Sequence, residues 1–389
     1  MDELGSEGKT TDQQFLSSPR LSGARLLPLD ALRGLIIAFM ALDHANYFIA
    51  QRHSSGEYWG GPFPVYSELA PFLTRFVTHF CAPGFFLLMG TAMTLFTYSR
   101  WERGWTGGMI LRHFLTRGVV LIALQLLIVN QAWSWGPKPF PPLYLGVLMA
   151  LGGAMILGSF LLSVGDLPLT MIMLVLFVGT EILHPAPALW GKLNLDALNL
   201  LLLRPGGDEF LWSNYPILPW LELVIFGMLL GRWIHRKPEH SLARMWILGA
   251  GLLAVFTVLR GLNGFGNIRP RPGSDWMDFL NPVKYPPSMT FTLLTTGVNL
   301  ILLSLFAWLD RRRIQALSIL TVFGRAPLFV YVLHLYLYLL LGKLLTPHGT
   351  SLLPMYFLWL FGLLILYPLA VWYAGWKSRQ PAASPAHLF

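Results

Sequence analysis

The sequence predicts an all-α, polytopic integral membrane protein, a bundle of about ten transmembrane helices with both termini in the cytoplasm. Of the 389 residues, 54% are hydrophobic and only 12% are charged, about half the charge of a typical soluble domain. Apolar runs of roughly 20 residues, the length that crosses a bilayer as a helix, recur along the chain. Basic residues cluster in the short connections between those runs, as the positive-inside rule describes.

Ten segments are apolar and long enough to span the hydrocarbon core. They are residues 34–50, 72–98, 114–133, 143–163, 167–184, 216–234, 245–262, 287–309, 326–345 and 354–376. The connections on one side of such a bundle collect most of the basic residues, namely Arg25, Arg33, Arg100, Arg103, Arg112, Arg117, Arg232, Arg236, Lys237, Arg311, Arg312, Arg313, Lys377 and Arg379. That side is predicted to be cytoplasmic. The same layout explains the net charge of +9 without a nucleic-acid partner.

The domain organisation follows from these spans. Residues 1–28 are predicted to be a disordered cytoplasmic tail, 29–376 the transmembrane domain and 377–389 a second cytoplasmic tail. The first 25 residues are polar and small, unlike a secretory signal.

The lone Cys81 leaves no partner for an intrachain disulfide. The outward loops 51–71, 185–215 and 263–286 are longer than a connection needs, and such loops usually carry function.

The first span carries charged groups that hydrocarbon penalises. In "LDALRGLIIAFMALDHANYF", residues 29–48, Arg33 and His44 are eleven positions apart. At 100° and 1.5 Å per residue they share one helix face, about 16 Å apart along the axis. Arg33 is expected at the cytoplasmic mouth and His44 in the outward half. A cation at the mouth and an imidazole three turns deeper suit a long substrate with an anionic head and a reactive tip, such as a coenzyme A thioester. The alternative is that Arg33 is a snorkelling anchor.

The second span, "FLTRFVTHFCAPGFFLLMG", adds Arg75 and His79, four positions apart and therefore on one face. His79 and His44 are expected to face each other across a polar site, where a histidine can take and return a proton. Asp43 either orients the His44 ring or pairs with Arg75. The alternative is a purely structural polar cluster between helices. The spacing of these residues is not that of a zinc site, so no metal is predicted.

The ninth span, "FGRAPLFVYVLHLYLYLLL", brings Arg325 at its start and His334 deep inside. His334 needs a hydrogen-bonding partner in apolar surroundings. Tyr331 and Tyr338 lie within one turn of it. Tyrosines near membrane boundaries usually belong to the interfacial belt, so they say little about a site.

Five stretches together resemble a known family: "LDALRGLIIAFMALDHA", "TRFVTHFCAPGFFLLMG", "YPILPW", "FLNPVKYPPS" and "FGRAPLFVYVLHLYL". In this order they are similar to a bacterial membrane-protein family related to lysosomal heparan-α-glucosaminide N-acetyltransferase, within the wider transmembrane acyltransferase superfamily. The spacing of Arg33 and His44 resembles the signature of that superfamily. The resemblance covers nearly the whole membrane region.

The resemblance implies a multipass acyltransferase of the bacterial cytoplasmic membrane. It would move an acyl group, acetyl in the first instance, from cytoplasmic acyl-CoA to a sugar amine or hydroxyl outside, with no tightly bound cofactor. The implied residues are His44, Asp43 and His79 for catalysis, Arg33, Arg75 and Arg325 for the coenzyme, and Lys284, Tyr285 and His334 for the acceptor. The oligomeric state is open, with a homodimer as one candidate.

A different class of function uses the same residues. Buried histidine, arginine and aspartate also form proton relays in transporters, so a proton-coupled transporter or flippase is the alternative. Matching halves with broken helices would favour a transporter, and the sequence shows no such symmetry. A non-enzymatic scaffold would leave the deep ionisable residues unexplained.

Overall fold

The protein is described here by a computed structural model, which describes residues 26–53, 57–61, 64–184, 196–381 and 384. The predicted disordered tail falls almost entirely on residues 1–25, and the end of the second predicted tail on 385–389, both outside the described residues. Where the chain is described, α1 already begins at Leu27 and α15 continues to Ser378.

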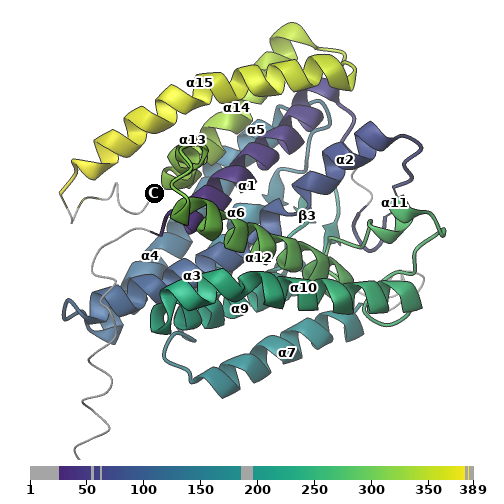
Figure 1. Ribbon diagram of the computed structural model, residues 1–389. Helices are drawn as coiled ribbons and strands as arrows, with labels where there is room; N and C mark the ends of the chain where they lie inside the picture. Colours follow the sequence, from purple (N-terminus) through teal and green to yellow (C-terminus); the bar gives the residue numbers. More distant parts are fainter. Residues whose placement is uncertain (1–25, 54–56, 62–63, 185–195, 382–383, 385–389) are drawn as a thin grey trace, which may run out of the picture.

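The molecule is a bundle of helices (Figure 1). Its helices are α1 (Leu27–Ala45), η2 (Asn46–Ala50), α2 (Leu69–Thr78), α3 (Cys81–Trp101), α4 (Gly107–Leu124), η3 (Gln125–Val129), α5 (Asn130–Ser134), α6 (Val147–Ser159), α7 (Asp166–Ile182), α8 (Ala197–Leu202), α9 (Ile217–Arg236), α10 (Pro238–Leu262), α11 (Trp276–Phe279), α12 (Met289–Arg311), α13 (Ala316–Arg325), α14 (Pro327–Leu345) and α15 (Leu352–Ser378). Here η2 and η3 are π-helical turns that continue α1 and α4.

The polytopic all-α prediction is confirmed. Each of the ten predicted spans contains a helix, although residues 143–145 of the fourth span form a strand. Within the described residues, seven helical segments are long and apolar enough to cross a membrane. The other three predicted spans correspond to α1, which carries three charged residues, and to the shorter α6 and α7. A total of ten spans, and cytoplasmic termini, therefore stay predictions.

Helix α1 runs through the middle of the bundle, with α15 along one edge and α7 along the opposite edge (Figure 1). It packs closely on α13, a short helix that the sequence analysis did not predict. A Cβ on Gly34 would lie 1.8 Å from the Leu320 carbonyl oxygen, and one on Gly324 would lie 1.9 Å from that of Asp30. Only glycine allows backbones to approach this closely. The contact brings the Gly324 carbonyl beside the charged start of α1.

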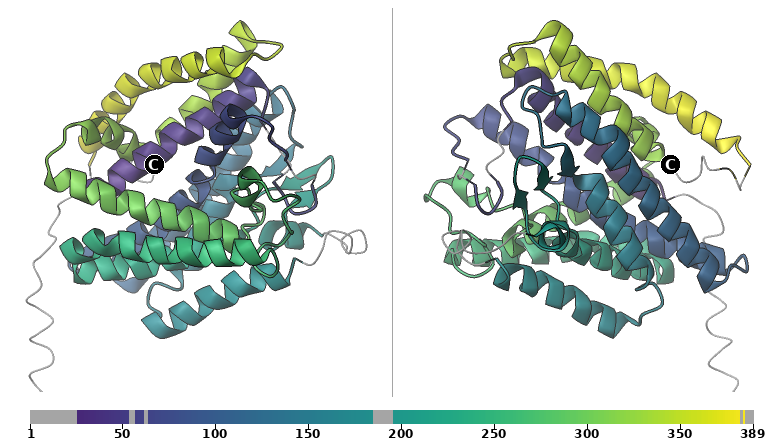
Figure 2. Two further views of the ribbon diagram at one scale, coloured as in Figure 1. Left: turned by 45° about the vertical axis from the view of Figure 1, so that its right-hand side comes forward. Right: turned by 180° about the vertical axis from the view of Figure 1, so that it is seen from behind.

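A small sheet joins the loops at the other end of α1. Strand β1 (Leu143–Leu145) pairs in parallel with β3 (Leu211–Ser213), which pairs antiparallel with β2 (Gly206–Gly207). The view from behind in Figure 2 shows these strands beside the helices. A parallel bridge between Tyr58 and Tyr285 ties the first long loop to the third. The sheet and the bridge thus join loops that lie far apart in the sequence.

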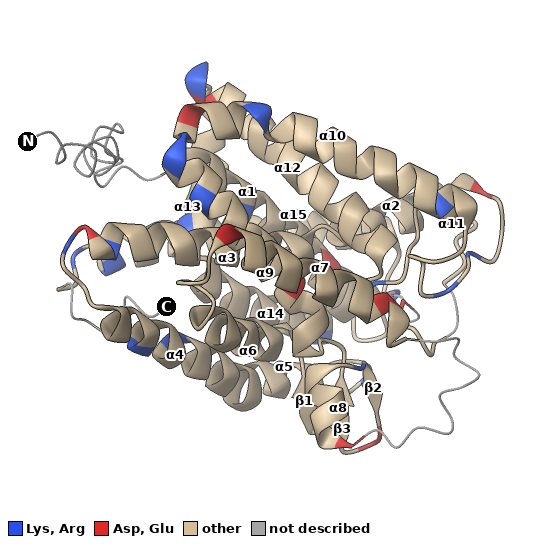
Figure 3. Cartoon of the chain, turned by 90° about the horizontal axis from the view of Figure 1, so that it is seen from below, with Lys and Arg blue, Asp and Glu red and all other residues tan. Residues whose placement is uncertain are grey.

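Charged residues are sparse along the helices and gather at their ends and in the connections (Figure 3). Leu26, Arg103 and Lys377 line one common cavity, although they come from the start of α1, the α3–α4 connection and the end of α15. One end of the bundle therefore collects three segments that the sequence analysis assigned to the cytoplasmic side.

Candidate functional site

A cavity of about 620 Å³ opens between α1, α3, α4, α6 and α14. It is rich in cationic side chains: Arg33, Arg103, Arg117, Arg325 and Lys377 all line it. We call this space the basic cavity. Two carboxylates, Asp30 and Glu102, also line it, so the cations exceed the anions and the cavity favours an anionic guest.

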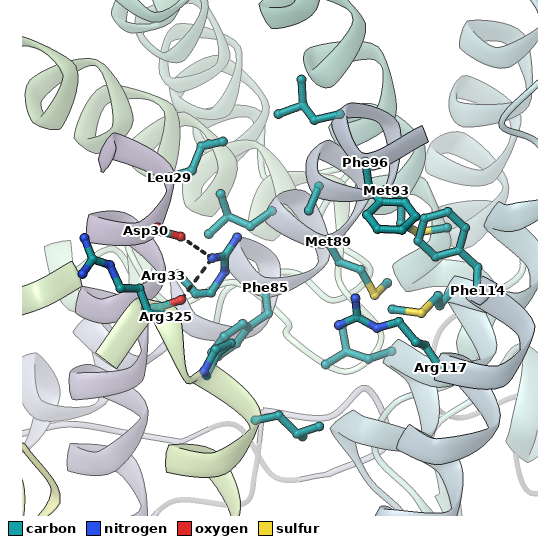
Figure 4. A pocket seen from close by; sticks show the side chains of 18 of the residues that line it. Leu29, Asp30, Arg33, Phe85, Met89, Met93, Phe96, Phe114, Arg117 and Arg325 are labelled. Atoms are coloured by element: carbon teal, nitrogen blue, oxygen red, sulfur yellow. Dashed lines mark hydrogen bonds and ion pairs between the residues drawn. The ribbon is translucent and has the colours of Figure 1, made fainter. Parts of the chain in front are cut away.

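The arginines of the basic cavity differ in what they already bind. Arg33 Nη1 donates to Asp30 Oδ1 at 2.7 Å and to the Gly324 carbonyl at 3.1 Å. Arg117, half-buried on α4, makes no hydrogen bond or ion pair with the part of the chain that the structure describes. Figure 4 shows Arg33 and Arg117 reaching into the cavity from α1 and α4. Arg117 therefore has its full donor capacity available for a bound anion.

The interior of the basic cavity is apolar. It is lined by four methionines, by aliphatic residues and by Phe85, and Tyr331 lines it as well; the methionines are Met40, Met89, Met93 and Met155. His44 does not line the cavity, but the ring of Tyr331 lies edge-on to it, with centroids 6.4 Å apart. The cavity thus reaches Tyr331 and comes within one aromatic ring of His44.

His44 is paired with His334 across α1 and α14. His44 Nδ1 and His334 Nε2 are 2.6 Å apart, and the two rings are nearly parallel at 12°. His334 Nδ1 lies 2.8 Å from the Val330 carbonyl. A carbonyl only accepts, so a neutral His334 carries its proton on Nδ1 and accepts at Nε2. His44 then donates through Nδ1, which leaves a lone pair on its Nε2.

The Nε2 atom of His44 is the reactive position of this pair. It has no hydrogen-bond partner among the described residues. The ring itself is buried, 7% exposed, and packed edge-on against Trp133 at 5.2 Å. A fixed tautomer with a free lone pair is the form that a general base or a nucleophile requires.

A second polar group, which we call the arginine cluster, comprises Asp43, His53, Glu57, Arg75, Thr78 and His79. Arg75 stands at its centre and is 2% exposed. Its Nε donates to Glu57 Oε1 at 2.6 Å and its Nη2 to Glu57 Oε2, while Nη1 donates to Asp43 Oδ1. Thr78 also donates to Asp43, at 2.8 Å. Such a bidentate, buried pair is geometrically exacting.

Glu57 joins this cluster from the loop before α2. Burial alone raises the pKa of its carboxyl, but the Arg75 guanidinium, with help from His79, outweighs burial and holds the pKa well below its usual value. The Glu57 carbonyl accepts from the backbone N–H groups of Lys284 and Tyr285, at 3.1 and 3.2 Å. The cluster therefore fastens two long loops to α1 and α2.

Lys284 and Tyr285 lie beside the arginine cluster rather than in the basic cavity. Lys284 is 3% exposed, and its Nζ sits 4.9 Å from the ring centroid of Tyr285. The Tyr285 hydroxyl shares a hydrogen bond of 3.0 Å with that of Tyr215. Within the described chain, Lys284 Nζ forms no ion pair, so a buried ammonium is available on this side of the site.

The predicted residues thus divide between the two places. Arg33 and Arg325 line the basic cavity, and His44 and His334 lie at its end. Arg75 was predicted to contact the coenzyme, but it does not line the cavity and is committed to Asp43 and Glu57. The remaining predicted residues, Asp43, His79, Lys284 and Tyr285, lie in or beside the arginine cluster.

The partners of His44 and His79 differ from expectation, whereas the partner of Asp43 is one of the two that were predicted. The histidine that meets His44 is His334, whereas His79 bonds Glu57 at 3.2 Å. The Glu57 oxygen that His79 meets also accepts from Arg75 Nε, so His79 belongs to the arginine cluster. Asp43, for which two roles were predicted, pairs with Arg75.

Sequence reasoning missed three contributors. Glu57 lies in a loop that was singled out only for its length, and Arg117 was interpreted only as an inside-positive residue. Tyr331 was set aside as an interfacial tyrosine. A charged residue inside the predicted span 114–133 would have been the signal for Arg117. Within the described residues, no group of three or more His, Cys, Asp or Glu side chains could hold a metal ion.

Comparison with known protein families gives a match to the model described as heparan-alpha-glucosaminide N-acetyltransferase, catalytic, over residues 25–261. The matched range includes α1 with Arg33 and His44, the arginine cluster and Arg117. It ends before the third long loop and α14. A comparison with curated proteins finds no match.

Proposed function

Because the chain belongs to the heparan-alpha-glucosaminide N-acetyltransferase catalytic family, a family of transmembrane acetyltransferases, we propose that it transfers an acyl group from cytoplasmic acyl-CoA to a sugar on the outer side. The acyl group is acetyl in the first instance, and the acceptor atom is an amine or a hydroxyl. Acyl-CoA acts as a co-substrate, and no tightly bound cofactor takes part. The membrane is the bacterial cytoplasmic membrane.

One observation carries this proposal: a cation-rich cavity whose apolar interior ends at Tyr331, directly beside the His44–His334 pair. The phosphates of CoA suit the guanidinium groups of Arg33, Arg117 and Arg325. The slender pantetheine arm suits the methionine-lined interior, since methionine side chains adapt to irregular shapes. The thioester then lies at the end of the cavity, next to the histidines.

His44 acts as the base in this reaction. The acceptor amine or hydroxyl attacks the thioester carbonyl carbon while its proton moves to His44 Nε2. The C–S bond then breaks, and the proton passes from His44 to the departing CoA thiolate. His334 fixes the His44 tautomer through the 2.6 Å hydrogen bond and is a positioning residue. In a covalent version of the same reaction, His44 Nε2 attacks the thioester carbon and the CoA thiolate leaves. The acceptor then takes the acyl group from Nε2, and its proton goes to the thiolate.

The arginine cluster and its neighbours serve the acceptor side. Asp43 is adjacent to His44 in the chain, and its ion pair with Arg75 fixes the end of α1 on which His44 lies. His79 supports Glu57 in the same network. Lys284 and Tyr285 provide polar groups that a sugar can engage beside the site.

The test uses purified protein in lipid nanodiscs with radiolabelled acetyl-CoA. Release of the CoA thiol is measured, because it also detects transfer of the acetyl group to water. Transfer of the label to glucosamine and to neutral hexoses is measured in parallel. CoA should raise the melting temperature, because a ligand of the folded state stabilises it. His44→Gln should lose the acetyl-CoA turnover, and the exposed His240→Gln should keep it.

Two results would overturn the proposal. If CoA does not stabilise the wild-type protein and acetyl-CoA keeps its acetyl group, the protein is not a CoA-dependent acyltransferase. That result would favour the transporter alternative. If His44→Gln keeps full turnover with a normal melting temperature, the assigned base is wrong.

A further inference from the structure

Tyr331 lies where the basic cavity meets the histidine pair. It lines the cavity on one side, and its ring packs edge-on against both His44 and His334, at centroid distances of 6.4 and 5.6 Å. It is 5% exposed, so it belongs to the interior of the bundle and not to an interfacial belt. A guest that reaches the histidines through the cavity meets Tyr331 first.

The hydroxyl of Tyr331 differs from those of the other tyrosines described in the same helix. Tyr338 donates to the Trp359 carbonyl at 2.8 Å, and Tyr336 donates to the Ile128 carbonyl at 2.6 Å. Tyr331 has no hydrogen-bond partner anywhere in the described chain. Buried tyrosine hydroxyls usually find a partner, so a free one at the end of a cavity has a donor to offer to a guest.

Acyl transfer needs such a donor. When the acceptor attacks the thioester, the carbonyl oxygen gains negative charge, and a hydrogen-bond donor fixed in advance in a dry site stabilises that charge strongly. Among the described residues, none of the charged side chains that line the basic cavity contacts His44 or His334. Tyr331 is the polar side chain of the cavity lining that contacts the histidine pair.

We propose that Tyr331 is a catalytic residue whose hydroxyl donates a hydrogen bond to the thioester carbonyl oxygen as it becomes an oxyanion. This inference rests on the proposed acyltransferase function. The acceptor oxygen or nitrogen bonds to the carbonyl carbon, the C=O electron pair moves onto the oxygen held by Tyr331, and His44 Nε2 takes the acceptor proton. When the C=O bond re-forms, the C–S bond breaks, and the proton leaves His44 with the CoA thiolate. Tyr331 keeps its own proton throughout.

The experiment compares Tyr331→Phe with Tyr338→Phe, which removes a hydroxyl from the same helix on the other side of His334. Tyr331→Phe should lower kcat for acetyl-CoA turnover about 100-fold to 1,000-fold, with the KM for acetyl-CoA nearly unchanged. Its melting temperature should stay near that of the wild type, because no hydrogen bond within the protein is lost. Tyr338→Phe should do the reverse, lowering the melting temperature and leaving kcat within a few-fold.

A second measurement separates binding from chemistry. CoA without an acyl group has no carbonyl to stabilise, so CoA should raise the melting temperature of Tyr331→Phe and of the wild type equally. If Tyr331→Phe turns over acetyl-CoA with the kcat of the wild type, the inference is wrong and the proposed function stays intact. Loss of CoA stabilisation in Tyr331→Phe would also overturn it, because Tyr331 would then bind the coenzyme. If the wild-type protein does not turn over acetyl-CoA and its melting temperature does not rise with CoA, the proposed function itself is wrong.

Discussion

The two polar regions of the bundle differ in how much of their hydrogen-bonding capacity they use. In the arginine cluster, Arg75 is bound to two carboxylates and the cluster joins two loops to two helices. Around the basic cavity, Arg117, Tyr331 and His44 Nε2 all lack a partner among the described residues. Arg75, whose bonds are made, maintains the structure, whereas the groups with free bonds at the basic cavity are ready for a ligand.

The largest expected effect is the loss of turnover on removing the base. His44→Ala should lower acetyl-CoA turnover by about 100-fold to 10,000-fold, because the remaining residues cannot accept the acceptor proton at that position. Steady-state assay of CoA release measures it, and His240→Ala on the exposed face of α10 is the control. Activity within a few-fold of the wild type would mean that the histidine pair is structural.

A substitution in the arginine cluster should lower the stability of the folded protein. Arg75→Leu leaves the carboxylates of Asp43 and Glu57 without their cation, and breaking a buried ion pair on one side costs about 3–5 kcal/mol. Denaturation in detergent with a helix-sensitive probe measures the loss. Arg112→Leu on the exposed face of α4 is the matched control. An unchanged stability in Arg75→Leu would contradict the structural role of the cluster.

A substitution in the basic cavity should weaken the binding of CoA. Arg117→Gln removes a free guanidinium, and a hydrogen bond to a charged group contributes about 1.5–3 kcal/mol, so CoA should bind roughly 10-fold to 100-fold more weakly. Titration calorimetry measures this, with Arg112→Gln as control. Since Arg117 makes no bond within the described chain, the melting temperature without ligand should hardly change. A large loss of stability with normal CoA affinity would place Arg117 with the structural residues.

The smallest effect concerns pH. Because the pKa of Glu57 is held below its ordinary value of 4.5 in the folded state, Glu57 contributes stability that is fully present above that value and is lost as pH falls through the lower, folded pKa. Wild-type melting temperature should therefore fall more steeply below pH 4.5 than that of Glu57→Gln. Parallel curves for the two proteins would show that the Glu57–Arg75 pair contributes no such dependence.

Most of the fold was accessible from the sequence because hydropathy alone marks helices in a bilayer. All ten predicted segments contain a helix, although 143–163 begins with strand β1. The shared face of Arg33 and His44 followed from the 3.6-residue period. Helix α13 was missed because, at 10 residues, it is too short to give a spanning signal. The small sheet was missed because its strands are two or three residues long.

The site was accessible only in part. Residue types and depth suggested His44, but its partner His334 lies 290 positions away, and no local pattern links the two. Arg75 was interpreted as a ligand-binding cation because its neutralising partner Glu57 comes from an irregular loop. Which cations remain free depends on tertiary pairing, which one sequence does not reveal.

The most direct test is a structure of the protein with CoA bound in a lipid nanodisc, determined by electron cryo-microscopy. The account predicts phosphate density between Arg33 and Arg117, and the thiol at the inner end of the cavity within reach of Tyr331 and His44. Coenzyme bound elsewhere, or a cavity that holds a lipid while CoA stays outside, would contradict it.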